Sequence, residues 1–163
     1  MTSLKRSFPP VVNADTRLLV LGSLPGEVSL AQRRYYAHPR NHFWRLMGEV
    51  VGLDLAGLNY AGRIDALLRA GVGLWDVVAS ASRRGSLDAS IRDHSPNPVA
   101  ALAGSLPSLR AVAFNGGTSA RIGRKELGTS SGLTLVPLPS SSPAFTLPYE
   151  RKREAWLELK DFL

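Results

Sequence analysis

The chain has 163 residues and no cysteine. That length fits one domain with a sizeable core, and the missing thiols exclude disulfides, cysteine nucleophiles, iron–sulfur clusters and the common sulfur-liganded zinc sites. Twenty Lys and Arg against 13 Asp and Glu give a formal net charge of +7, which favours a polyanionic partner. No apolar run approaches the roughly 20 residues of a membrane span, so we expect a cytoplasmic protein.

Short apolar runs alternate along the chain with segments of helical spacing. Buried strands are predicted at 17–21, 73–78, 111–114 and 133–138. Helices are predicted at 41–51, 61–70, 98–103, 119–127 and 149–163. This alternation predicts an α/β fold, in which a mostly parallel sheet is covered on both faces. Such sheets bind ligands beyond the carboxyl ends of their strands.

The remaining segments complete the predicted organisation. Residues 1–14 read as a loose N-terminal arm, and 15–163 as a single domain. Residues 80–98 form a long polar connection, and a loop of that length is more often functional than idle. The last helix should bury a stripe made of Ala155, Trp156, Leu159 and Phe162. Its opposite face should be wet and carry Glu150, Lys152, Arg153 and Lys160.

A glycine-rich turn follows the first strand and consists of Gly22, Ser23, Leu24, Pro25 and Gly26. Two glycines around a proline let the backbone turn sharply and approach a ligand closely. The turn matches neither the Walker pattern nor the dinucleotide fingerprint. An ordinary strand-to-helix turn is the alternative.

The segment 35–44 is the densest aromatic and imidazole cluster of the chain. Aromatic rings interleaved with arginines suit base stacking beside phosphate contacts. Phe43 and Trp44 are better explained as the start of a core-facing helix, whereas Tyr36 is freer to line a pocket. His38 and His42 are four residues apart, but Pro39 lies between them, so a zinc site is not expected.

Three further strand ends carry polar residues. Asp76 could accept a hydrogen bond from the ring N–H of a base, or could simply cap a turn. The glycines after Asn115 could form an anion site at a helix start or a routine cap. The last strand is followed by a stiff turn that could offer hydroxyls and backbone N–H groups to phosphates; it comprises Ser140, Ser141, Ser142, Pro143 and Ala144. Phe145, directly after this turn, is a candidate wedge residue that could enter a DNA duplex.

Four motifs together resemble the uracil-DNA glycosylase superfamily, most closely its family 6, the hypoxanthine-DNA (deoxyinosine) glycosylases. They are Gly-Ser-Leu-Pro-Gly at 22–26 with Ser29-Leu30 after it, Tyr-Tyr-Ala-His-Pro-Arg-Asn-His-Phe-Trp at 35–44, Leu-Trp-Asp-Val at 74–77 with Gly-Ser-Leu-Asp at 85–88, and Leu-Pro-Ser-Ser-Ser-Pro at 138–143. The motifs fall in family order and span most of the chain.

The resemblance implies a three-layer α/β/α sandwich with a central four-stranded parallel sheet. It also implies hydrolysis of an N-glycosidic bond without strand cleavage, cofactor or metal. By matching position, Asn41 is the catalytic residue and Tyr36 stacks on the extruded base. The turn at 22–26, with His38 and Asp76, forms the base pocket. Residues 140–143 and Phe145 hold the DNA.

The sequence departs from its relatives at three positions. Leu24 stands where mismatch-specific relatives carry a catalytic Asn, so the role of holding the hydrolytic water passes to Asn41. Leu138 stands where several relatives have a His that stabilises the departing base. Phe145 replaces an Asn common in family 6, so the shape of the wedge loop is open.

The expected partner is double-stranded DNA containing damaged bases, bound by a monomer that is associated with the nucleoid in a prokaryote. Three alternatives stay open at this point. The protein could be a uracil or thymine mismatch glycosylase, or a catalytically weak damage-binding module of the same fold. A doubly wound domain that binds a small nucleotide is the third.

Overall fold

The computed structural model describes residues 4–128 and 132–163. Its centre is a four-stranded sheet in which every neighbouring pair is parallel. The strand order is β3-β2-β6-β7, with β2 at Leu18–Gly22, β3 at Val72–Asp76, β6 at Ala111–Asn115 and β7 at Thr134–Leu138. The predicted α/β class and the four-stranded parallel sheet are confirmed.

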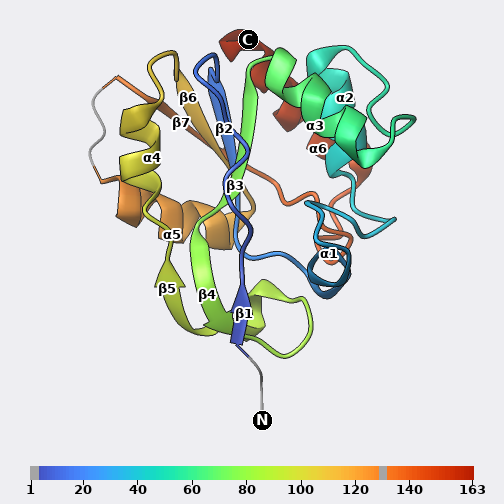
Figure 1. Ribbon diagram of the computed structural model, residues 1–163. Helices are drawn as coiled ribbons and strands as arrows, with labels where there is room; N and C mark the ends of the chain where they lie inside the picture. Colours follow the sequence, from blue (N-terminus) through green and yellow to red (C-terminus); the bar gives the residue numbers. More distant parts are fainter. Residues whose placement is uncertain (1–3, 129–131) are drawn as a thin grey trace.

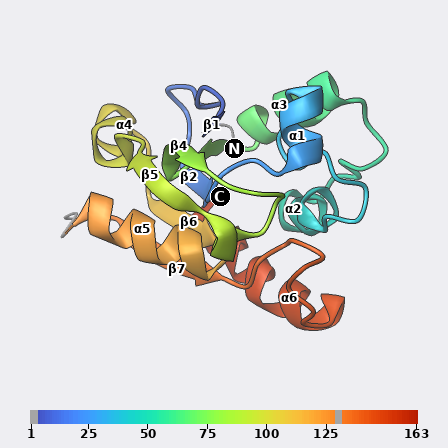
Figure 2. The same ribbon diagram turned by 90° about the horizontal axis from the view of Figure 1, so that it is seen from below.

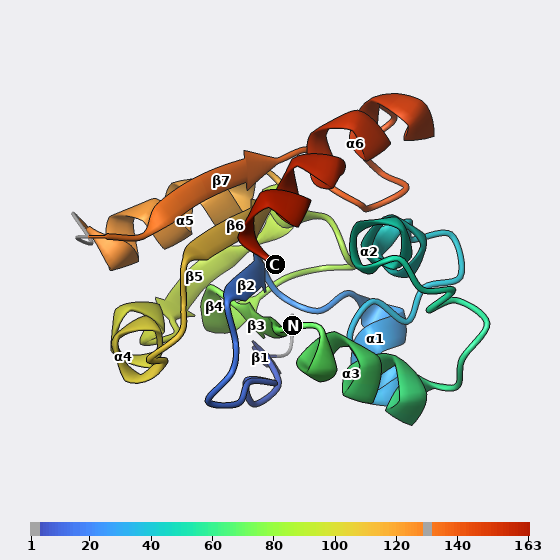
Figure 3. The same ribbon diagram turned by 90° about the horizontal axis from the view of Figure 1, so that it is seen from above.

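Helices cover both faces of this sheet (Figures 1 and 3). One face is covered by α2 (Phe43–Val51), α3 (Tyr60–Arg69) and α6 (Tyr149–Trp156), and the other by α4 (Val99–Ser105) and α5 (Gly117–Leu127). Side chains alternate along a strand, so Leu18 and Val20 enter one hydrophobic cluster while Leu19 and Leu21 enter the other. Burial along their whole length explains why β2, β3 and β6 are largely apolar, whereas the edge strand β7 is mostly exposed or half-buried.

A second, antiparallel sheet lies beside the first (Figures 1 and 2), and we did not predict it. It consists of β1 (Leu4–Arg6), β4 (Val78–Ser82) and β5 (Arg92–Pro96), with a 3-10 turn, η1, at Asp88–Ser90. The prediction of a loose arm is therefore wrong for the described residues 4–14, because β1 pairs with β4 and Val11 bridges to Leu74; residues 1–3 lie outside the described part. The predicted connection at 80–98 is likewise mostly ordered structure.

Several element boundaries differ from the predicted ones. The predicted strand at 73–78 is two strands, since β3 ends at Asp76 and β4 starts at Val78. A short helix, α1, occupies Glu27–Gln32, and the last predicted helix becomes the 3-10 segment η2 at Leu157–Phe162. Within the described residues, no helix is long and apolar enough to cross a membrane.

The last helix also corrects one predicted side-chain environment. Lys152, which we expected to be wet, is fully buried. It stands four residues before Trp156 and seven before Leu159, so helical geometry places all three on one face. Trp156 and Leu159 are also fully buried.

The contact between α5 and the sheet predicts an unusual effect of alanine. Gly123 packs on Phe114, and a Cβ there would lie 2.8 Å from the ring Cδ1. Although alanine normally stabilises a helix interior relative to glycine, we expect Gly123→Ala to lower the free energy of unfolding by about 1–3 kcal/mol through overpacking. Urea unfolding measures this change.

The matched control is Gly104→Ala in α4, where a Cβ would meet no atom within 4 Å. That variant should gain about 0.5–1 kcal/mol from helix propensity alone. A loss of the same size in both variants would contradict the packing explanation.

Candidate active site

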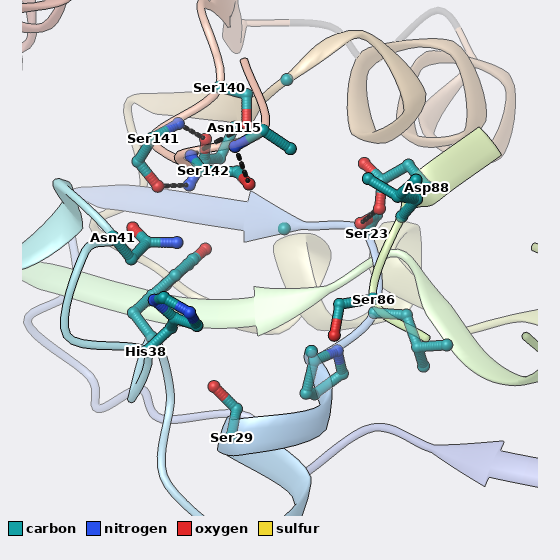
Figure 4. Close-up of a pocket in the computed structure, with 18 of the residues that line it drawn as sticks. Ser23, Ser29, His38, Asn41, Ser86, Asp88, Asn115, Ser140, Ser141 and Ser142 are labelled. Atoms are coloured by element: carbon teal, nitrogen blue, oxygen red, sulfur yellow. Dashed lines mark hydrogen bonds between the residues drawn. The ribbon is translucent and has the colours of Figure 1, made fainter. Parts of the chain in front are cut away.

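The carboxyl ends of the parallel strands border one cavity of about 540 Å³ (Figure 4). The strand register brings them together, since Gly22 pairs with Asp76 and Asn115 with Leu138. Every residue that the sequence suggested for the site lines this cavity, namely 22–26, Tyr36, His38, Asn41, Asp76, 140–143 and Phe145. The structure therefore gathers these residues in one place, while their roles stay predictions.

The glycine-rich turn at 22–26 is held from below by a buried arginine. Arg83 is 1% exposed and donates hydrogen bonds to the backbone oxygens of Leu24 (3.3 Å) and Pro25. Its Nε donates to the oxygen of Gly85 at 2.8 Å. These bonds tie the turn to the segment between β4 and η1, so the second sheet supports one wall of the cavity.

The same segment contributes two side chains to that wall (Figure 4). The Ser23 hydroxyl donates to Asp88 Oδ1 at 2.6 Å, and the Ser86 hydroxyl accepts a hydrogen bond from the backbone nitrogen of Glu27 at 2.8 Å. Burial raises the pKa of Asp88, while the Ser23 hydrogen bond and Arg83 oppose that rise. The turn is thus fixed at both of its ends.

Tyr36 is held in an uncommon backbone conformation. Its φ of 53° lies in the left-handed region that glycine favours, and its backbone oxygen accepts a hydrogen bond from Trp44 Nε1 at 3.2 Å. One face of its ring stacks on Phe43, with the ring centroids 3.8 Å apart. Strain of this kind persists where the surroundings dictate it, often at functional sites.

The polar tips of Tyr36 and Asp76 meet beside Gly22. A Cβ on Gly22 would stand 2.5 Å from Asp76 Oδ1 and 2.9 Å from Tyr36 Oη, so only glycine leaves them room. Asp76 is 3% exposed, and neither its Oδ2 nor Tyr36 Oη has a hydrogen-bond partner in the described part of the chain.

Burial dominates the ionisation of both groups. It raises the pKa of Asp76 to about 7, with the charge of Asp88 adding to the rise and Arg83 opposing it. Burial also raises the pKa of Tyr36, and the Asp76 carboxylate raises it further, while the Asn115 side chain lowers it. Near neutral pH the Asp76 carboxyl is therefore partly protonated and partly ionised, whereas the Tyr36 hydroxyl keeps its proton.

Asn41 lies just before α2 with its amide oriented by the backbone. Its Oδ1 accepts a hydrogen bond from the nitrogen of Phe43 at 2.9 Å. The next residue, His42, donates its backbone N–H to the oxygen of Ser141 at 3.0 Å. Asn41 is consequently fixed between the helix and the serine turn, at the rim of the cavity (Figure 4).

The serine turn is anchored by a side chain from the neighbouring strand. Asn115 Nδ2 donates to the Ser141 hydroxyl and Asn115 Oδ1 accepts from the Ser141 nitrogen, both at 2.9 Å. Beneath the turn, Lys152 Nζ donates to the oxygen of Ser142 at 3.0 Å. In residues 4–128 and 132–163, no carboxylate lies within ion-pair distance of this ammonium. Phe145, beyond the turn, is 46% exposed.

The histidines make no metal centre in the described part of the chain. His38 Nδ1 accepts a hydrogen bond from the nitrogen of Arg40 at 3.1 Å, and the ring of His42 packs edge-on against Tyr149. No group of three or more His, Asp or Glu among the described residues could hold a metal ion.

Sequence reasoning missed three residues that shape the site. Arg83 lay in the segment we expected to be a loop, and nothing in a single sequence distinguishes it from the exposed Arg84. Lys152 could have been found, because its spacing from Trp156 and Leu159 matches a buried face. The side chain of Asn115 was overlooked because we considered only the glycines after it.

Known proteins resemble this chain over nearly its whole length. Residues 9–160 match the uracil DNA glycosylase superfamily. Hypoxanthine DNA glycosylases of Methanosarcina barkeri (strain Fusaro) and Methanosarcina acetivorans are 40% and 36% identical to it, and each alignment covers 94% of this chain and 96% of the relative. The solution NMR structure of a presumed uracil DNA glycosylase from Methanosarcina acetivorans superposes with a TM-score of 0.84 at 34% identity and 97% coverage of both chains.

The raised pKa of Asp76 predicts how stability depends on pH. Between the ordinary value of 3.8 and about 7, the native state binds a proton that the unfolded state has released. Stability therefore falls as pH rises through this window. We expect Asp76→Asn, which cannot ionise, to match the wild-type melting temperature near pH 4 and to exceed it at pH 8.

Thermal unfolding followed by circular dichroism between pH 4 and 8 tests this expectation. The control is Asp161→Asn, on an exposed residue of η2, which should differ from wild type by the same amount at both pH values. If the melting temperatures of wild type and Asp76→Asn changed in parallel with pH, ionisation of the Asp76 carboxyl would have no effect on stability, and the expectation would be wrong.

Proposed function

Because the chain belongs to the uracil DNA glycosylase superfamily, we propose that it is a monofunctional DNA glycosylase that removes deaminated bases, hypoxanthine first, from double-stranded DNA. The observation that carries this proposal is the single cavity in which Asn41 and Asp76 face the glycine-rich and serine turns. The relatives named hypoxanthine DNA glycosylases, at 36–40% identity, support hypoxanthine as the base.

The base must leave the helix before it can enter this cavity. Extruding a nucleotide costs a few kcal/mol and least where the base is mispaired. The cavity lies beyond the strand ends, so the extruded base would reach it from the side bordered by the serine turn and Phe145. Weak pairing of a deaminated base is then part of the selectivity.

Asn41 would position the attacking water. Its Oδ1 has two lone pairs, of which the Phe43 N–H uses one, so the other can accept a hydrogen bond from the water. A neutral amide is a weak base, and its contribution is orientation rather than proton removal. As the C1′–N bond breaks, the water oxygen bonds to C1′, one water proton goes to solvent, and the base departs as an anion that is then protonated.

Stabilisation of the departing base would come from fixed dipoles. Leu24 and Leu138 provide no polar side chain for this purpose. The backbone of the turn at 22–26 borders the cavity and is immobilised by Arg83. The N-terminus of α5, at Gly117 and Thr118, also borders it. Dipoles that need no reorientation lower the barrier where negative charge develops.

The serine turn and the buried lysine beneath it would grip the DNA backbone. The turn offers hydroxyl and N–H groups that suit phosphate oxygens, and the ammonium of Lys152 adds an unpaired positive charge directly below. The exposed ring of Phe145 would enter the helix as a wedge. Since one chain supplies the whole cavity, we propose that it acts as a monomer in the cytoplasm, on the nucleoid of a prokaryotic cell.

The central experiment incubates the protein with duplexes that contain deoxyinosine, uracil or a G·T mismatch, followed by alkali. Strand breaks after alkali should appear first with deoxyinosine. Breaks only with uracil or G·T would favour the alternative substrates, and binding without breaks would favour a damage-binding module.

The Asn41→Ala variant tests the assignment of the water. We expect its single-turnover excision rate to fall by about 10²-fold or more because the water loses its position, while affinity for the lesion duplex stays within about twofold. The control is Asn59→Ala, which removes a comparable side-chain cap from Gly62 at the start of α3. Excision at the wild-type rate by Asn41→Ala would refute the role of Asn41.

The Lys152→Met variant tests the buried charge under the serine turn. It keeps the apolar stem, and the fold should tolerate the change because the Ser142 oxygen that loses its donor belongs to a residue that is only half-buried. We expect about tenfold weaker duplex binding, the loss typical of a hydrogen bond to a charged group. Lys160→Met, on an exposed residue of η2, removes the same charge and should bind within about twofold of wild type. Equal losses would mean that only net charge matters.

A further inference from the structure

The floor of the cavity holds a buried donor and a buried acceptor without partners. Tyr36 Oη and Asp76 Oδ2 are both shielded from solvent and form no hydrogen bond in the described residues. Leaving a buried polar group unsatisfied lowers stability, and most buried polar groups in proteins are satisfied. Two such atoms at one point therefore indicate a place prepared for a ligand with complementary groups.

Several contacts keep this pair together. Gly22 has no side chain, and both polar tips lie against the place where a Cβ would be. The Tyr36 ring is fixed from behind by Phe43, and its backbone by Trp44. Asp76 is the last residue of β3, directly opposite Gly22 in the parallel register. Asp76 is thus positioned by the sheet, whereas Tyr36 lies in the connection between α1 and α2 and is held there by Phe43 and Trp44.

The two members differ in what they can do. The Tyr36 hydroxyl retains its proton and donates, whereas Asp76 accepts once its carboxyl has lost its proton. A ligand that satisfies both must offer an acceptor next to a donor. An oxo group beside a ring N–H has this order and occurs on hypoxanthine and uracil. In a base held in the same orientation by its glycosidic bond, the amino group beside an unprotonated ring nitrogen, as in adenine and cytosine, presents the reverse order.

We propose that the Tyr36 hydroxyl is a specificity-determining residue that donates to the oxo group of the extruded base, while Asp76 accepts the neighbouring ring N–H. This inference rests on the proposed glycosylase function and adds to it a criterion by which deaminated bases are admitted and their amino parents refused. A site built to hydrogen-bond a polar edge rejects an analogue that leaves its groups unpaired.

Tyr36→Phe is the decisive variant because it keeps the ring and its stacking on Phe43 and removes only the hydroxyl. Binding is measured to three duplexes that are identical except at one nucleotide. The first carries a non-hydrolysable 2′-fluoro-arabino deoxyinosine, the second the same nucleotide with unsubstituted purine, which lacks the oxo group, and the third a tetrahydrofuran abasic analogue. Tyr60→Phe is the matched control; it removes a tyrosine hydroxyl that accepts a hydrogen bond from the Tyr35 nitrogen.

We expect Tyr36→Phe to bind the inosine duplex about tenfold more weakly than wild type and the purine and abasic duplexes within twofold of wild type. Tyr60→Phe should resemble wild type on all three. Unchanged affinity for the inosine duplex, or equal losses on all three duplexes, would overturn the inference, since the hydroxyl would then be silent or merely structural. An equal loss on the inosine and purine duplexes alone would overturn it as well, because no oxo group would be involved.

The same preparations separate this inference from the proposed function. Wild-type protein that excises none of the test bases would refute the glycosylase assignment. Wild-type protein that excises hypoxanthine, together with a Tyr36→Phe variant that excises and binds it equally well, would refute the hydroxyl's role alone.

Discussion

The close approach of Gly22 to Asp76 and Tyr36 is the constraint on which the cavity depends. Parallel pairing aligns Gly22 with Asp76, and the missing side chain lets two polar tips share a space that a methyl group would fill. In an open parallel sheet the carboxyl edge is where successive loops converge. Here the strand ends bring Gly22 and Asp76 together, and Tyr36, from the connection between α1 and α2, reaches the same point. The result is one hydroxyl donor beside one carboxyl acceptor.

Much of the fold follows from apolar periodicity alone. The central strands are buried on both faces, so their sequences are uninterrupted apolar runs, and the helices between them show a regular stripe. The antiparallel sheet has no such signal. The strand β5, at Arg92–Pro96, is exposed throughout, and β1 has only three residues. These strands are determined by pairing with β4, and pairing between distant segments leaves little trace in one sequence.

The site was predictable to the extent that its residues sit in compact motifs. Asn41 and Tyr36 belong to one short segment, and Asp76 ends a strand, so sequence could nominate all three. Arg83 and Lys152 could not be nominated as easily, since burial of a cation depends on distant carbonyl groups. Arg83 binds the oxygens of Leu24 and Pro25, nearly 60 positions away. For Lys152 the helical spacing was visible, but the usual preference of lysine for solvent outweighed it.

The second sheet, which the sequence did not predict, contributes to the rigidity of the cavity around Tyr36 and Asp76. An unpaired carboxylate and hydroxyl in a cavity lower stability, and a cavity bordered only by loops would relax by letting them turn toward water. Arg83 opposes such relaxation of the wall by joining the glycine-rich turn to the segment that leaves β4, and the Ser23 hydrogen bond to Asp88 closes the same wall. Asp88 in turn disfavours ionisation of Asp76. The antiparallel sheet therefore helps to fix the wall of the cavity next to Tyr36 and Asp76, and a hydrogen bond formed in such a fixed, low-dielectric setting is stronger than one in water.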